Sequence, residues 1–235
     1  MGFSLDLRAR IVDSIEAKLG KEMRLNYVPV NSSNRIPLIQ NGTVDIECGG
    51  TANNKTRQQQ VSFSVATFVS QPRWLVLARN DLKGADDLKT VVATQGSNAV
   101  GFAQALSAQG MDLNIAQAKD HAESFLMLTS GRTVAFMEDD ILLAGLRAAA
   151  PDPSALIFLP EAYDRIYYGL MFTKGGAEFK AVVDDTLKGL MASGEFTAIY
   201  DQWFTQPIPP RNENLDFAMG EALKERVANP SDAVE

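Results

Sequence analysis

The alternation of apolar and polar residues predicts the first elements of the chain. Residues 5–19 carry apolar side chains at helical spacing, and Gly20 follows as a stop signal. Residues 23–27 then place an apolar side chain at every second position, which predicts a strand that ends at Pro29. The chain therefore begins with a helix and continues into a strand.

The stretch from Asn31 to Ser64 organises the rest of the prediction. It reads as a short helix carrying Arg35, a strand over residues 44–48, a Gly-Gly-Thr loop, and a second helix carrying Arg57. Gly42 is expected to end the first of these helices. The two arginines therefore converge on the end of one strand.

Strands and helices alternate through the remainder of the chain. Further strands are expected at 74–78, 91–94, 113–115, 134–137, 156–159 and 167–172. Helices are expected at 86–89, through Phe102 and Leu106, and at 124–128, 141–149, 177–193, 195–204 and 221–227. This alternation predicts an α/β protein with largely parallel sheets, whose ligand sites lie beyond the carboxyl ends of strands. Gly50, Gly96 and Asp139 occupy such ends.

Composition excludes several classes of function. The chain has 235 residues, 46% of them hydrophobic and 22% charged, as in ordinary globular proteins. A net charge of −7 without a basic run argues against nucleic-acid binding. With one Cys and one His, neither an intrachain disulfide nor a His/Cys metal cluster can form, and no cofactor is expected. Residues 1–6 have neither a basic start nor an apolar core, so we expect no secretory signal in this sequence.

The polar residues at the strand ends allow more than one interpretation. Two arginines beside a glycine-rich turn favour a small acidic ligand, because a guanidinium binds a carboxylate through two parallel hydrogen bonds. Spacing alone favours surface ion pairs for both arginines. The turn at Gly96 leads into a helix N-terminus that favours an anion, although such turns also merely reverse the chain. Asp139 could be a ligand-binding acid or only a helix cap.

Several motifs resemble one protein family in the same order. They are NRIPLIQNGTVDIECG, TRQQQVSFS, KDHAESF, SGRTVAFMEDDILLAG and QWFTQPIPPRNENLDF. These segments resemble bacterial extracytoplasmic amino-acid-binding proteins, the solute receptors of ABC transporters, and most closely the glutamate/aspartate receptors. The resemblance runs from Gly2 nearly to the C-terminus.

The resemblance implies a two-lobed type II periplasmic-binding-protein fold, each lobe a largely parallel sheet flanked by helices. Lobe 1 would be discontinuous, formed by residues 1–69 and 167–235, and residues 70–166 would form the inserted lobe 2. Hinges would lie near 67–71 and 165–168, and the lobes would close around the ligand.

The resemblance also implies roles for individual residues. Arg57 would clamp the α-carboxylate of an amino acid, with Gly96 and Ser97 completing the clamp, and Asp139 would receive the α-ammonium. Arg35 matches a position that holds the side-chain carboxylate. The other positions implied to contact the ligand are Ser32, Gly50, Thr51, Thr94 and His121.

The sequence departs from the glutamate/aspartate subgroup at three places. Gly50 stands where the subgroup has a serine, and Ala52 where it has a threonine, so two ligand-facing hydroxyls are absent. Each lost hydrogen bond typically costs about 0.5–1.5 kcal/mol. The first strand of the family is also missing, together with an arginine-bearing loop. We expect rearrangement or a partner chain, such as a second copy forming a homodimer, to complete the sheet.

The leading functional hypothesis is a periplasmic receptor that carries an acidic amino acid or dicarboxylate to the permease subunits of an ABC transporter. A truncated, dimerising or sensor-like descendant with altered or lost ligand binding is an alternative. An enzyme resembling the dehydratase branch of the fold would need a general acid, with Glu47, Glu138 and Asp140 as candidates. Because no nucleophile elbow, Walker loop or metal-ligand spacing occurs, we predict a protein that is not an enzyme.

Overall fold

A computed structural model describes residues 2–209, 212 and 214–234. The chain forms two compact units. Unit 1 comprises Met1–Pro29, Arg35–Val69 and Tyr167–Glu235, and unit 2 comprises Val30–Asn34 and Ser70–Ile166. The chain thus changes unit at Val69/Ser70 and again at Ile166/Tyr167, and the hinge role expected for these crossings stays a prediction. Within the described ranges, no helix has the length and apolar character needed to cross a membrane.

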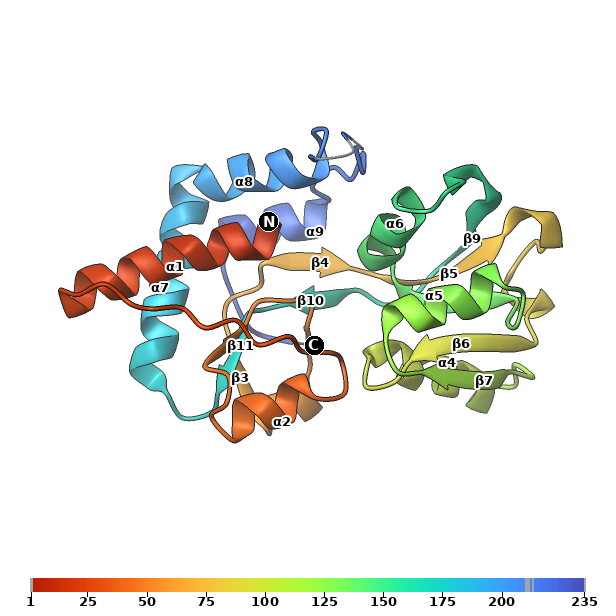
Figure 1. Ribbon diagram of the computed structural model, residues 1–235, viewed down its shortest axis with the longest axis horizontal. Coiled ribbons are helices and arrows are strands. Elements are labelled where there is room, and N and C mark those ends of the chain that lie inside the picture. Colours follow the sequence, from red (N-terminus) through yellow and green to blue (C-terminus); the bar gives the residue numbers. More distant parts are fainter. Residues whose placement is uncertain (1, 210–211, 213, 235) are drawn as a thin grey trace. The chain divides into compact units, whose positions relative to one another are not determined.

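Unit 1 is built from short strands and longer helices (Figure 1). Its helices are α1 (Phe3–Leu19), α2 (Arg35–Gln40), α3 (Lys55–Gln58), α7 (Ala177–Ser193), α8 (Glu195–Phe204) and α9 (Glu221–Ala228). Its strands are β1 (Ile46–Glu47), β2 (Ala52–Asn53), β3 (Val61–Phe63) and β11 (Met171–Thr173), and β4 (Phe68–Ser70) and β10 (Ile166–Tyr168) lie at the crossings. The strand order is β1-β11-β3 in one sheet and β2-β10-β4 in the other.

Unit 2 contains one five-stranded sheet in the order β7-β6-β8-β5-β9. Its strands are β5 (Pro72–Leu77), β6 (Thr90–Thr94), β7 (Asn114–Ala118), β8 (Ala135–Asp139) and β9 (Leu156–Ala162). Its helices are α4 (Asn98–Ala108), α5 (His121–Thr129) and α6 (Asp140–Ala148), and its 3-10 helices are η1 (Ala78–Asn80), η2 (Ala85–Asp87) and η3 (Pro153–Ala155). The mixed α/β class predicted from the sequence is confirmed. β6 pairs in parallel with β7 and β8, whereas the pairs of β5 and the β1–β11 and β3–β11 pairs of unit 1 are antiparallel.

The sheet of unit 2 is buried on both faces. Trp74 and Val76 of β5 belong to the core on one face, and Leu75 and Leu77 to the core on the other. Successive side chains of a strand point to opposite faces, so a strand covered on both sides reads as a continuous apolar run. This explains why β5 carries no polar alternation.

The core of unit 1 is aromatic. The Phe3 ring packs edge-on against Phe196, Tyr200 and Phe204, with ring centroids 5.2–5.7 Å apart. The Phe68 ring stacks on Tyr200 at 5.9 Å. Leu7 and Ile11 of α1 are fully buried, and α1, α7 and α8 contact one another. The apolar residues at helical spacing therefore form the side of α1 that packs in the core of unit 1.

One predicted strand does not form. Residues 23–27 have the alternating pattern of a strand, but residues 23–29 form no regular secondary structure. A strand needs a neighbour for its backbone groups, and none of the described strands lies along this segment. The strand predicted over 167–172 is instead divided into β10 and β11 at Gly169, where a Cβ would lie 3.0 Å from the Ser64 carbonyl oxygen.

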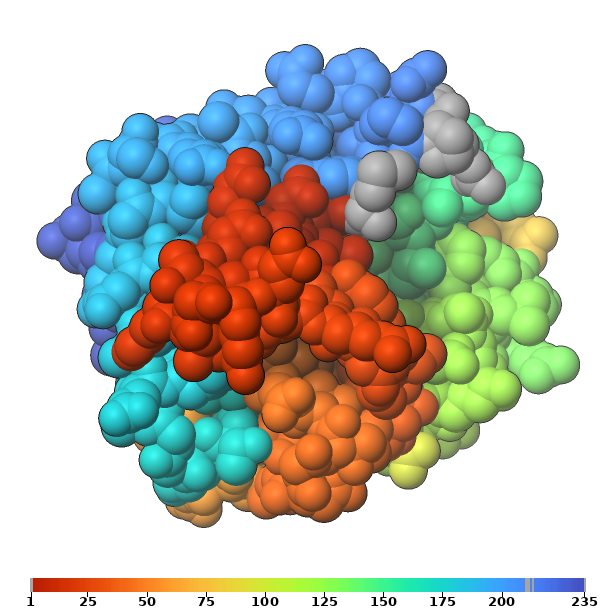
Figure 2. Space-filling model, turned by 60° about the vertical axis from the view of Figure 1, so that its left-hand side comes forward, coloured from red at the N-terminus to blue at the C-terminus, as the bar shows by residue number. Residues whose placement is uncertain are grey.

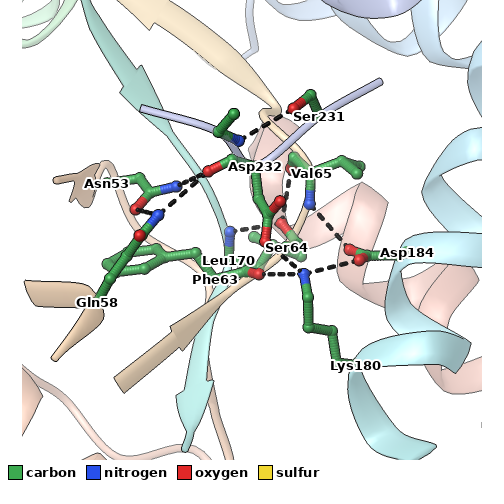
Figure 3. Close-up of polar contacts among 11 residues, drawn as sticks. Asn53, Gln58, Phe63, Ser64, Val65, Leu170, Lys180, Asp184, Ser231 and Asp232 are labelled. Atoms are coloured by element: carbon green, nitrogen blue, oxygen red, sulfur yellow. Dashed lines mark hydrogen bonds and ion pairs between the residues drawn. The ribbon is translucent and has the colours of Figure 1, made fainter. Parts of the chain in front are cut away.

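The end of the chain is fastened to unit 1 by Lys180 of α7 (Figure 3). Its ammonium donates to the Phe63 carbonyl oxygen at 2.7 Å and to the carboxylates of Asp184 at 2.8 Å and Asp232 at 2.9 Å. Burial acts to lower the pKa of Lys180, but the hydrogen bonds to the two carboxylates prevail, so its pKa is raised. The Asp232 carbonyl oxygen in turn accepts hydrogen bonds from Asn53 at 2.9 Å and Gln58 at 3.2 Å.

We predict that Lys180→Met lowers the free energy of unfolding by about 1–3 kcal/mol, because it leaves the buried Asp184 carboxylate without its cation. Urea unfolding measures the change. Lys188→Met on the same helix removes an exposed lysine and should be nearly neutral. Because the folded-state pKa is raised, the contribution should persist up to pH 10.5, the ordinary lysine value, and decline above it. Equal losses in the two variants would contradict this role.

Candidate functional site

The predicted site residues of unit 2 gather at one edge of its sheet. β6 and β8 run in parallel, so Thr94 and Asp139, the last residue of each strand, lie at the same edge. β7 is parallel to β6 as well, and the loop after it leads to His121 at the start of α5. Strand direction thus brings together residues that are far apart in sequence.

Thr94 is the centre of a buried polar cluster. Its hydroxyl lies 2.8 Å from Nδ1 of His121 and 2.8 Å from the hydroxyl of Ser124, and both Thr94 and Ser124 are fully buried. The same nitrogen of His121 lies 3.4 Å from a carboxylate oxygen of Glu138. These contacts fix the orientation of the imidazole ring, whose side chain is 34% exposed. His121 is therefore held by a network rather than standing alone on a loop.

The Asp139 carboxylate does not cap the following helix. Asp139 occupies the N-cap position of α6 but forms no side-chain cap hydrogen bond. It is 1% exposed, and its Oδ1 accepts a hydrogen bond from the Asn98 amide at 3.1 Å. Asp140 instead accepts hydrogen bonds from the Ser70 hydroxyl and from the Ile141 N–H. The alternative that the Asp139 side chain only caps α6 is thus wrong.

Gly96 and Ser97 form the turn between β6 and α4. Ser97 caps α4, its hydroxyl accepting the Ala99 N–H at 3.2 Å. Gly96 has φ of +78°, and a Cβ there would lie 2.6 Å from the Ser32 carbonyl oxygen and 2.8 Å from Cα of Ser33. The segment Val30–Asn34 therefore packs directly on this turn, which brings Ser32 beside Gly96.

The predicted residues of unit 1 surround the loop after β1. Arg35, the first residue of α2, is 7% exposed, and its Nη1 donates to the Gly50 carbonyl oxygen at 3.4 Å. Its Nε has no hydrogen-bond partner among the described residues. Thr51 is fully buried and donates to the Glu47 carboxylate at 2.6 Å. The loop therefore buries one guanidinium and one carboxylate that do not pair with each other.

Arg57 lies in α3, which Asn54 caps. The Asn54 side chain accepts the Arg57 N–H at 2.8 Å, and the Arg57 Nη1 donates to the Ala52 carbonyl oxygen at 2.8 Å. Arg57 is 8% exposed, so it is no surface charge. The surface ion-pair interpretation is therefore wrong for both arginines, since each is buried.

Sequence reasoning missed two residues of these clusters. The Asn98 amide donates a hydrogen bond to the Asp139 carboxylate. In the sequence, only its polar character at the start of α4 pointed to such a role. The Tyr168 ring lies against Gly50, with Cε2 3.1 Å from the position of a Cβ there. An aromatic ring beside a glycine that is distant in sequence leaves no sequence signal. The candidate general acids Glu47, Glu138 and Asp140 all take part in the internal contacts described above.

Comparison with known proteins decides the family. The model of the bacterial extracellular solute-binding proteins, family 3, matches residues 1–206. The chain belongs to this family. A solute-binding protein is a receptor and not an enzyme, which confirms the prediction from motif absences.

Curated relatives of this solute-binding protein match it over almost its whole length. The L-glutamate/L-aspartate-binding protein of Pseudomonas aeruginosa is 47% identical over 99% of this chain and 78% of its own length. The glutamate/aspartate import solute-binding protein of Escherichia coli is 41% identical with the same coverage. Among solved structures, an ancestral arginine-binding protein bound to arginine superposes with a TM-score of 0.76 at 26% identity, covering 87% of this chain and 88% of that one. The resemblance to amino-acid receptors is thereby confirmed.

We predict that Gly96→Ala destabilises unit 2 by about 1–3 kcal/mol more than Gly131→Ala, as overpacking does. Both glycines have positive φ, +78° and +77°, so both alanines incur the same backbone strain. Only Gly96 faces backbone, because the nearest atom to a Cβ at Gly131 is the end of the Arg79 side chain at 3.7 Å. Urea unfolding gives the difference, and equal destabilisation would show that Ser32 does not press on the turn.

Proposed function

We propose that this solute-binding protein captures an acidic amino acid, glutamate or aspartate, for uptake by an ABC transporter. The observation that carries the proposal is the buried guanidinium of Arg35, which pairs with no carboxylate among the described residues. A buried cation without a counter-charge costs several kcal/mol. A carboxylate supplied by the ligand would neutralise it and accept its Nε–H.

The remaining roles follow from the chemistry of a zwitterion. Arg57 holds the α-carboxylate in the proposal, with the turn at Gly96 and Ser97 adding donors to it. Asp139 receives the α-ammonium in the proposal, since a buried carboxylate is a suitable partner for a cation. The Asn98 amide would keep that carboxylate oriented toward its ligand.

Other predicted residues would complete the recognition of the side chain. The remaining proposed ligand contacts are Ser32, Gly50, Thr51, Thr94 and His121. The network around Thr94 supports a role for His121, because it fixes the ring before a ligand arrives. The Tyr168 ring beside Gly50 would replace, with a flat apolar surface, the hydroxyl that the glutamate/aspartate subgroup carries there.

The names of the relatives support the place and the partner. One is described as a glutamate/aspartate import protein, and the family consists of extracellular solute-binding proteins. We therefore place this receptor in the periplasm, where it would deliver its ligand to the permease subunits of a transporter. A descendant that has lost its ligand remains the alternative, and calorimetry with amino acids separates the two.

We predict that Arg57→Ala and Asp139→Asn each weaken glutamate binding by at least about 30-fold, because each removes one partner of a buried charge pair. Isothermal calorimetry measures the affinity, and thermal unfolding checks that each variant folds. Arg132→Ala, which removes an exposed arginine, is the matched control and should bind like the parent. Undiminished affinity in either variant would remove that residue from the site. Absence of binding in the parent would favour the alternative.

We predict that Arg35→Met lowers the ratio of glutamate to glutamine affinity by about tenfold or more, because a charged hydrogen bond is worth about 1.5–3 kcal/mol. Glutamine has the same α-groups but a neutral side chain, so its binding should change less. Competition calorimetry with both amino acids gives the ratio. If both affinities fell equally, Arg35 would support the loop at Gly50 rather than read the side chain.

A further inference from the structure

Glu138 of β8 is a buried acid that the proposed function does not use. It is 1% exposed, and its Oε2 lies 3.4 Å from Nδ1 of His121. Its Oε1 accepts the Asp139 N–H at 3.2 Å, so both carboxylate oxygens have a contact. His121 begins α5, whose light green atoms lie at the surface of unit 2 in Figure 2, and its side chain is 34% exposed. The ring therefore links a buried carboxylate to the surface of this unit.

A chain of hydrogen bonds decides which nitrogen of the ring carries a proton. The Ser124 hydroxyl donates to the Asp120 carbonyl oxygen at 3.1 Å, so its oxygen accepts the Thr94 hydroxyl proton at 2.8 Å. The Thr94 oxygen, whose proton points to Ser124, then accepts from Nδ1 of His121 at 2.8 Å. An ionised carboxylate is also only an acceptor, so Glu138 favours the same proton. Nδ1 therefore carries a proton whatever the charge of the ring.

The position of this proton sets what the other ring nitrogen offers to a ligand. In the neutral ring Nε2 has no proton and is an acceptor, which repels a carboxylate. In the imidazolium Nε2 carries a proton and donates it to an acceptor, so it attracts a carboxylate. His121 thus binds an acidic side chain through Nε2 only as a cation. A carboxylate beside Nδ1 stabilises that cation.

Other charged groups near the ring belong to α5 and the loop before it. Asp120 and Glu123 accept the backbone N–H groups of Glu123 and Lys119 at 2.8 Å and 3.0 Å. Lys119 is exposed, and both acids are half-buried. Water and salt screen charges that are not fully buried, so these three side chains affect the ring less than Glu138 does.

The neighbouring strands add two charged side chains besides Glu138. Asp139 follows Glu138 in β8, so it points to the opposite face of the sheet, and it accepts a hydrogen bond from Asn98. Arg73 lies opposite Glu138 in the register of β5 and β8, and its guanidinium donates to the Leu159 carbonyl oxygen. Arg73 therefore supplies positive charge on the face of Glu138 and favours its ionised form. Glu138 is thus a buried anion in direct contact with the ring.

We propose that Glu138 keeps the His121 ring cationic, so that its Nε2–H binds the side-chain carboxylate of the captured amino acid. Glu138 acts through His121 and is therefore a positioning residue, one that favours an acidic ligand over its amide. The inference rests on the proposed function, in which His121 contacts the ligand side chain. Binding of an acidic ligand then takes up a proton wherever the ring of the free protein is neutral.

The first experiment titrates the His121 ring of the ligand-free protein by NMR. His121 is the only histidine of the chain, so its ring is identified without assignment. The midpoint should lie above the ordinary value of about pH 6.5, and Glu138→Gln should lower it by about 1 pH unit or more. Glu123→Gln, which removes a carboxylate from the same helix, is the matched control and should leave the midpoint nearly unchanged. The same midpoint in the parent and in Glu138→Gln would overturn the proposal.

The second experiment measures glutamate and glutamine affinities by calorimetry from about pH 5.5 to about pH 8.5. The ratio of the two should fall about tenfold or more as the ring loses its proton, because a charged hydrogen bond is lost. Glu138→Gln should move this fall to lower pH by as much as it moves the ring midpoint. The shared α-groups cancel in the ratio. The Cys48 thiol does not titrate in this range, because burial and then Glu47 raise its pKa to about 12.

Proton uptake is measured in the same titrations. Above the midpoint, the heat of glutamate binding should depend on the ionisation heat of the buffer, whereas the heat of glutamine binding should not. A glutamate-to-glutamine ratio that stays constant over this pH range would overturn the proposal. Failure of the proposed function has a different signature, since the parent would then bind neither amino acid at any pH.

Discussion

A buried charge must meet its counter-charge, and in this protein Arg35 does not meet one among the described residues. Arg35 is 7% exposed, and its guanidinium donates a hydrogen bond to the Gly50 carbonyl oxygen. Asp139 is buried at 1% beside the amide of Asn98. Each unit thus buries a charged side chain, and burial disfavours an ion unless a partner stabilises it. The proposed function gives Arg35 such a partner, the carboxylate of a bound amino acid.

The fold keeps these charges in place through strand direction and helix capping. Parallel pairing of β6 with β8 puts Thr94 and Asp139 at one edge of the sheet, although the two residues are far apart in the sequence. Asn54 caps α3 and so fixes the backbone from which Arg57 projects. Such supports are local, and each holds a side chain in a fixed position.

Sequence patterns predicted the helices and strands that depend on consecutive residues alone. The bounds expected for α7 and α8 match the structure, because helical spacing and Gly194 are properties of consecutive residues. The strand expected over residues 23–29 was wrong, because pairing depends on a neighbour that the segment itself does not contain. Asp139 and Asp140 show the same limit. Their order in the sequence could not tell that the carboxylate of Asp140, and not that of Asp139, accepts a backbone N–H at the start of α6.

Residues beyond the family match support the fold of unit 1. The family match ends at residue 206, yet the Asp232 carbonyl oxygen accepts hydrogen bonds from Asn53, just before α3, and from Gln58, the last residue of α3. A protein fragment cut at residue 206 would lose these two hydrogen bonds, which support the helix that carries Arg57. The end of the family match is therefore not the end of the folded unit. A shortened protein should keep the chain through Asp232.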